Sequence, residues 1–220
     1  MQPYMIKLMR YLLAAFILTI TTAAYGQTAP VPPGRPSTVS KPTRKGTPAR
    51  PDEGGVAGGV YTEKFFNLSC TIPQGWLVKT AAMRESLPAD ENSVLLLSAF
   101  AKDAPAPREV NSSLTITAES LAAYPEVETA ADYFDSLTEL VRSKGFTVLN
   151  EPAEIEVGGI TFVRGDFQKD QADGSTYQAT MVAIRNGYIL AVTAISGKDE
   201  DLTPLLNRVR VFAPPTLKKQ

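Results

Sequence analysis

The chain has 220 residues, 44% of them hydrophobic, with one cysteine and no histidine, which excludes Ser-His-Asp and Cys-His catalysis and zinc sites of the His-Glu-x-x-His type. The net charge is −1, but the first 51 residues hold seven of the 22 basic residues and no acid, so residues 52–220 combine 15 basic with 23 acidic residues, a net charge of −8. Such an acidic part argues against a nucleic-acid partner and against docking on an anionic membrane, because both need clustered lysine and arginine.

Residues 1–26 follow the order of a secretory signal peptide: two basic residues, an apolar run at 11–20, then small residues. Ala24 and Gly26 suit positions −3 and −1 of a cleavage site, which predicts cleavage before Gln27. An uncleaved membrane anchor is the alternative, but a spanning helix needs about 20 apolar residues, more than this run provides. We expect a secreted or periplasmic protein with no stable membrane span after cleavage.

Residues 27–60 are predicted to be a disordered, basic, proline-rich linker. Seven prolines are mixed with serine, threonine, lysine and arginine, and apolar residues are too few to offset chain entropy. Proline favours extended polyproline II geometry, so the linker reads as a semi-stiff spacer that ends in a flexible glycine joint at 54–59. The spacer carries five basic residues between 35 and 50. A solvated tether is the favoured interpretation, and adhesion to an anionic envelope surface is the alternative.

The folded domain is predicted at residues 61–213, followed by a tail at 214–220. Its first half reads as short strands at 65–72, 76–78, 93–100 and 114–118; the third is a continuous apolar run typical of a strand buried on both faces. Cys70 is interpreted as a small buried apolar residue, with an exposed thiol that pairs with another chain as the alternative.

One helix is predicted at 129–144. Thr129 can cap its start with Asp132 as the reciprocal partner, and Gly145 ends it. One apolar stripe runs along it, made of Phe134, Leu137, Leu140 and Val141.

The second half of the domain is predicted to be an antiparallel meander. Glycine-containing turns at 158–159, 173–174 and 186–187 link strands at 153–157, 160–168, 175–185 and 188–196. Both faces of the last hairpin are apolar, which indicates a sheet covered on both sides. A second helix, beginning between Asp199 and Thr203 and ending near Val211, is expected to cover one face. The fold class is therefore predicted as α+β, an antiparallel sheet flanked by helices on both faces in a three-layer α/β/α sandwich.

Three short motifs point to a known family. They are the Pro-x-Gly-Trp turn at 72–76, the 131–145 helix followed by segments 148–152 and 157–160, and the acidic helix start at 197–201 followed by 205–212. Together they resemble the PsbP-like superfamily, which includes the PsbP proteins of photosystem II and the bacterial envelope protein DcrB. The resemblance covers residues 61–212 and implies an α/β/α sandwich whose members are mostly binding or assembly modules.

Acidic residues are the remaining candidates for chemistry. The 170–174 segment is interpreted as a hairpin turn and not a calcium loop, because the alternating acids of such a loop are missing. Glu151, Glu154 and Glu156 are interpreted as a charged strand edge, and the acids at 199–201 as a helix start. No catalytic, metal or cofactor residue is predicted.

The candidate contact patch consists of four aromatic residues, Tyr61, Phe65, Phe66 and Trp76, with packing in the core as the alternative. We expect an exported, non-enzymatic binding, assembly or accessory module of the bacterial cell envelope, with an unknown protein or envelope component as its partner. A carboxylate-based envelope hydrolase is the alternative.

Overall fold

The computed structural model describes residues 50–86, 91–172 and 174–212. The predicted signal peptide, most of the predicted linker and the predicted tail lie outside the described residues.

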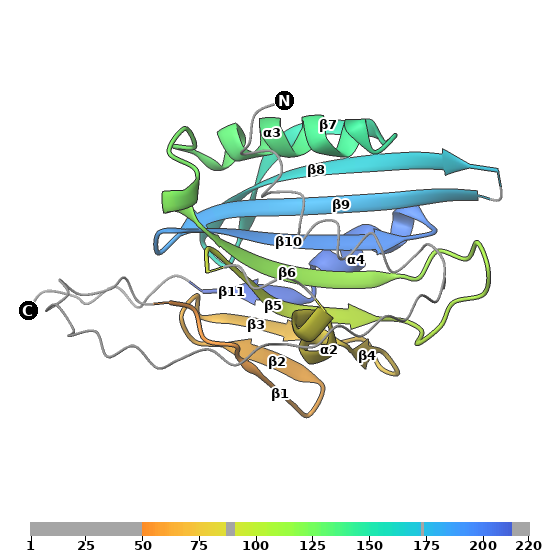
Figure 1. The fold of residues 1–220 in the computed structure, drawn as a ribbon, viewed down its shortest axis with the longest axis horizontal. Coiled ribbons are helices and arrows are strands. Elements are labelled where there is room, and N and C mark those ends of the chain that lie inside the picture. The colour runs from red at the N-terminus through yellow and green to blue at the C-terminus, as the bar shows by residue number, and fades with distance from the viewer. Residues whose placement is uncertain (1–49, 87–90, 173, 213–220) are drawn as a thin grey trace, which may run out of the picture.

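Two antiparallel sheets make up most of the described fold (Figure 1). The larger sheet has the strand order β4-β5-β6-β10-β9-β8-β7, with bounds β4 (Leu77–Val78), β5 (Ser93–Phe100), β6 (Ser113–Ser120), β7 (Thr147–Val157), β8 (Ile160–Gln171), β9 (Gly174–Arg185) and β10 (Tyr188–Ser196). The smaller sheet has the order β1-β2-β3-β11, with bounds β1 (Gly55–Ala57), β2 (Val60–Glu63), β3 (Leu68–Thr71) and β11 (Val209–Val211). The α-helices are α2 (Thr80–Ser86), α3 (Ala130–Ser143) and α4 (Leu202–Leu206), and two short 3-10 turns, η1 (Leu121–Ala123) and η2 (Asp199–Asp201), complete the described elements.

The predicted meander is confirmed. Strands β7, β8, β9 and β10 pair consecutively, and the last hairpin has the expected register, with Arg185 opposite Tyr188 and Ala183 opposite Leu190. Asn186 and Gly187 occupy the turn with φ values of 53° and 79°, the left-handed region that a two-residue hairpin turn requires.

Both faces of the large sheet are buried, as the apolar pattern predicts. On one face, Tyr133, Phe134 and Leu137 of α3 pack with Val182 of β9 and Ile189 of β10. Figure 1 shows α3 beside β7 and β8, with β1, β2 and β3 on the side of the molecule away from α3.

The second face is covered differently from the expectation. The small sheet and the five-residue α4 cover it, and their core residues pack against the large sheet; they include Phe66, Leu68, Cys70, Leu202, Leu206, Val209 and Val211. The predicted longer helix ends at Leu206, with Pro204 in its first turn, where proline is tolerated. The β-branched Val209 and Val211 then alternate inward and pair with β3 as a strand. The described fold is α+β, but the expected pair of long covering helices is not formed.

The expectation of a flexible joint at residues 54–59 is also corrected. These glycines form the β1–β2 hairpin, in which Ala57 pairs with Val60 across Gly58 and Gly59. Folded structure therefore begins before the predicted domain start at residue 61. The interpretation of Cys70 is confirmed, because its thiol is free and buried.

Helix α3 begins with the predicted capping box. The Thr129 hydroxyl accepts from the Asp132 amide at 3.2 Å, and the Asp132 carboxylate accepts from the Thr129 amide at 2.7 Å. The bond from the Thr129 amide to the carboxylate is the main cause that holds the pKa of Asp132 below its usual value, because it stabilises the ionised form.

Replacing Thr129 with alanine should lower the free energy of unfolding by about 1 kcal/mol, since one amide in the first turn loses its acceptor. Urea unfolding followed by Trp76 fluorescence measures this change. Ser136→Ala, at an exposed position in the middle of α3, is the control and should cost nothing. Equal losses in the two variants would contradict the capping role.

Candidate functional site

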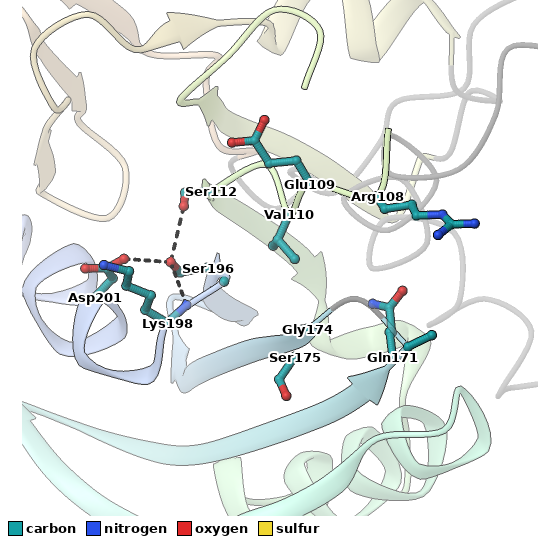
Figure 2. Close-up of a pocket in the computed structure, with 12 residues that line it drawn as sticks. Arg108, Glu109, Val110, Ser112, Gln171, Gly174, Ser175, Ser196, Lys198 and Asp201 are labelled. Carbon is teal, nitrogen blue, oxygen red and sulfur yellow. Dashed lines mark hydrogen bonds between the residues drawn. The ribbon is translucent and has the colours of Figure 1, made fainter. Parts of the chain in front are cut away.

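The first open cleft of the molecule lies where β10 ends. It has a volume of about 650 Å³, and we call it the serine cleft. Its walls come from the loop before β6, the β8–β9 turn and the start of η2, with Ser112, Gln171, Ser175, Ser196, Lys198 and Asp201 among the lining residues. Figure 2 shows these side chains around the opening.

A hydrogen-bond network centred on Ser196 forms the base of the serine cleft (Figure 2). The Ser196 hydroxyl donates to the Asp201 carboxylate at 2.8 Å, lies 3.2 Å from the Ser112 hydroxyl, and accepts from the Lys198 amide at 3.3 Å. Ser196 is buried, so these contacts replace those that water would make. The Ser196 hydroxyl directs its proton at the Asp201 carboxylate, and its oxygen also has the Ser112 hydroxyl and the Lys198 amide as partners.

The acids of the serine cleft are also engaged. Glu109 forms an ion pair with Lys102 and accepts from the Ala106 amide at 3.1 Å. The Lys102 contact, followed by this backbone bond, lowers the pKa of Glu109. Glu109 therefore stays ionised at neutral pH, which is the wrong form for a general acid.

The second open cleft lies at the opposite end of β10, beside Tyr188. It has a volume of about 720 Å³, and we call it the tyrosine cleft. Apolar side chains dominate its walls, among them Leu121, Tyr124, Pro125, Val127 and Tyr188, and Arg50 and Glu91 also line it. Eight residue steps of about 3.3 Å separate the two ends of β10, so the clefts lie about 26 Å apart.

No sequence motif marked either cleft. The serine cleft joins residues from the loop before β6 and from β8, β9, β10 and η2, and among them only the 170–174 segment and the acids at 199–201 were singled out from the sequence. Those acids form η2, directly before α4, as their interpretation as a helix start predicts. Ser196 ends an apolar strand and is followed by Gly197 and Lys198, and this pattern is the same as that of an ordinary turn. The sequence therefore does not mark Ser196 as part of a cleft.

Half of the predicted aromatic patch lies in the core. Tyr61 and Phe66 are 2% and 0% exposed, whereas Phe65 and Trp76 are partly buried against the same core. Phe65 meets Phe66 edge-on at 4.9 Å between ring centroids. In this conformation only Phe65 and Trp76 of the four present surface, and their contact role stays a prediction.

The remaining acids lie where the sequence placed them. Strand β7, with Glu151, Glu154 and Glu156, is an edge strand of the large sheet. Asp170 is the second-last residue of β8 and accepts from Ser175 at 2.7 Å, as expected of a hairpin turn. Within the described ranges, His, Cys, Asp and Glu form no group of three that could hold a metal ion.

A buried carboxylate, Glu63, organises the β2–β3 turn. It is 2% exposed, and its two oxygens accept from the amides of Phe65 and Phe66, each at 2.8 Å. Burial is the main cause that raises the pKa of Glu63, and the two amide bonds oppose it. The folded state therefore binds the Glu63 proton more tightly than the unfolded chain does.

This shift predicts a pH dependence of stability. A raised folded-state pKa contributes stability that is fully present below the unfolded pKa and is lost as the pH rises through the folded pKa. The free energy of unfolding of the wild type, minus that of Glu63→Gln, should increase as the pH falls from 7 toward the ordinary glutamate range. Urea unfolding at several pH values measures it. A difference that is flat or decreases on acidification would contradict the raised pKa.

Comparisons with known proteins show likeness only at the level of structure. No family model matches the sequence, and no curated protein matches it. The chain is similar to cyanobacterial PsbP from Synechocystis sp. PCC 6803, at a TM-score of 0.49 and 13% identity over 72% of this chain and 98% of that one. It is also similar to LpqN, involved in cell envelope biogenesis of Mycobacterium tuberculosis. That TM-score is 0.43, with 12% identity over 74% of this chain and 90% of that one.

A third similar structure is the protein of unknown function PA94 from Pseudomonas aeruginosa, with a TM-score of 0.37 and 18% identity over 53% of this chain and 76% of that one. The similarity to cyanobacterial PsbP concerns the fold alone. None of the helices among the described residues is long and apolar enough to cross a membrane.

Proposed function

We propose that this chain is an exported, non-enzymatic binding module of the bacterial cell envelope, and that its partner contacts the serine cleft. The observation that carries the proposal is the closed network at the base of that cleft, where Ser196, Ser112 and Asp201 already satisfy one another. Nucleophilic catalysis needs a base that takes the serine proton and passes it on, and the chain has no histidine for this role. Export is supported by the signal pattern of residues 1–26.

The rim of the serine cleft offers the groups that a partner would meet. Lys198 and Gln171 are exposed, and Ser175 is partly exposed. Two basic residues, Arg108 and Lys198, line the cleft together with amide and hydroxyl groups. This set suits a polar partner that carries hydrogen-bond acceptors, such as a peptide backbone with acidic side chains.

A hydrolase built on carboxylates is less well supported. Such an enzyme needs one acid that remains protonated near neutral pH, opposite a second, ionised acid. Lys102 lowers the pKa of Glu109, so Glu109 does not supply the protonated partner for Asp201.

The binding role is tested by photo-cross-linking in intact cells. A photoreactive residue is placed at Lys198 or Gln171, and at Glu139 on the exposed side of α3 as the control. We expect adducts of a defined mass at the first two positions and not at the third. Identical labelling at all three positions would overturn the assignment of the partner to the serine cleft.

Export has its own test. The N-terminus of the protein purified from the envelope fraction of expressing bacteria is sequenced, and Gln27 is the expected first residue. A protein that retains Met1 in the cytoplasmic fraction would overturn the exported role.

A further inference from the structure

We propose that the tyrosine cleft binds the proline-rich, basic segment of this same chain, residues 30–48, which directly precedes its rim. The proposal rests on the walls of the cleft, on the charges around it and on the point where the chain enters the described structure. It is independent of the function proposed for the serine cleft.

The walls have the composition that recognises polyproline II segments. Tyr124 and Tyr188 line the cleft together with Leu121 and Pro125. Grooves lined by aromatic rings bind proline-rich chains because the rings pack against the flat pyrrolidine faces, and because such chains lose little entropy on binding. The segment supplies prolines at 30, 32, 33, 36, 42 and 48.

Both tyrosines are held in place by their neighbours. The Tyr124 hydroxyl donates to buried Glu119, and its ring meets Tyr133 edge-on at 5.9 Å between centroids. Tyr188 meets Phe65 and Phe66 edge-on at 5.5 and 6.1 Å. The aromatic walls are therefore formed before a ligand arrives, which lowers the entropy lost on binding.

The charges around the cleft complement those of the segment. Glu91 and Arg50 line the cleft with opposite charges, and two further acids, Glu126 and Glu128, are exposed next to lining residues, so acids outnumber the lining base here. Residues 30–48 contain four basic residues, Arg35, Lys41, Arg44 and Lys45, and no acid. A basic peptide is thus attracted to this end of the sheet.

The chain enters the described structure at the cleft itself. Arg50 lines the cleft and donates to the carbonyl of Ser93 at 3.4 Å, and the next residue, Pro51, is buried. A segment joined directly to the rim meets the cleft at an effective concentration in the millimolar range. Even a weak affinity then favours this segment over the same segment of a second copy.

Cysteine cross-linking in the full chain tests the proposal. Ala122, an exposed residue of the cleft wall, and Thr43 are both replaced with cysteine and joined with a short bismaleimide at low protein concentration. The native thiol does not interfere, because burial raises the pKa of Cys70 to about 12. We expect an internal cross-link within the monomer.

The control variant keeps the length of the segment but removes the prolines that the aromatic walls are expected to bind. Changing Pro36, Pro42 and Pro48 to serine alters no residue of the described fold. It should slow the internal cross-link by about tenfold, which corresponds to about 1.4 kcal/mol of docking free energy. An excess of a synthetic peptide of residues 30–48 should slow the unaltered chain in the same way.

Two results would overturn the proposal. A cross-linking rate that neither the serine variant nor the free peptide changes would show that Thr43→Cys reaches the wall by tethering alone. Covalent dimers in place of the internal product, at every concentration tested, would show that the segment of a second copy occupies the cleft.

Discussion

Replacing Gly158 with alanine should lower the free energy of unfolding by about 3–5 kcal/mol, among the larger effects of single substitutions. Gly158 lies in the β7–β8 turn with a φ of 61°. A side-chain carbon there would stand 1.8 Å from the carbonyl oxygen of Val211 and 2.9 Å from its carbonyl carbon. Both atoms belong to the backbone of β11, so the clash is relieved only by moving the turn or the strand.

Gly159 is the matched control for this prediction. Its φ is 77°, so alanine carries a similar backbone penalty, of about 1–2 kcal/mol, but no other atom lies within 4 Å of the added carbon. Urea unfolding of Gly158→Ala and Gly159→Ala measures the difference, which isolates the contact with β11. If the two variants are equally stable, the close approach of the turn to Val211 is wrong.

The parts of the fold that could be predicted are those whose signals are local. Helix α3 has its cap at Thr129, its apolar stripe and Gly145 within one short stretch of chain. The meander has one glycine turn at each end of its central strands, so neighbours in sequence are also neighbours in the sheet.

The pairing of β11 in the small sheet could not be predicted, because it joins distant parts of the chain. Strand β3 pairs with β2, and also with β11, where Val209 lies opposite Cys70 and Val211 opposite Leu68. The three residues of β11 resemble the end of a helix in sequence, and only the partner strand decides their conformation. Helix α2 was missed because its seven residues have no acid in the first turn and only Met83 as a buried apolar residue.

Neither cleft follows from the sequence, for the same reason. The serine cleft and the tyrosine cleft lie at the two ends of β10, where loops from separate strands meet. The predicted aromatic patch lies next to the tyrosine cleft, because the rings of Phe65 and Phe66 pack edge-on against Tyr188, which lines that cleft. Phe66, predicted as part of a contact surface, thus lies in the core beside the cleft-lining Tyr188.

This arrangement predicts a large difference between two adjacent phenylalanines. Phe66 is fully buried beside Leu68 and Cys70, so Phe66→Ala removes a ring from the core and should cost about 3–5 kcal/mol of unfolding free energy. Phe65 is only partly buried, so Phe65→Ala should cost roughly 1–2 kcal/mol, the lower part of the usual range. Urea unfolding followed by Trp76 fluorescence compares the two variants.

The comparison separates the two interpretations of the aromatic patch. If all four aromatic residues were exposed to contact a partner, both substitutions would leave the free energy of unfolding unchanged and would weaken the binding of that partner. In the described fold the Glu63 carboxylate accepts from both phenylalanine amides, so the backbone of the turn is held in the same way in either variant. Any difference in stability then reflects the side chains, and similar small losses for Phe65→Ala and Phe66→Ala would contradict the core position of Phe66.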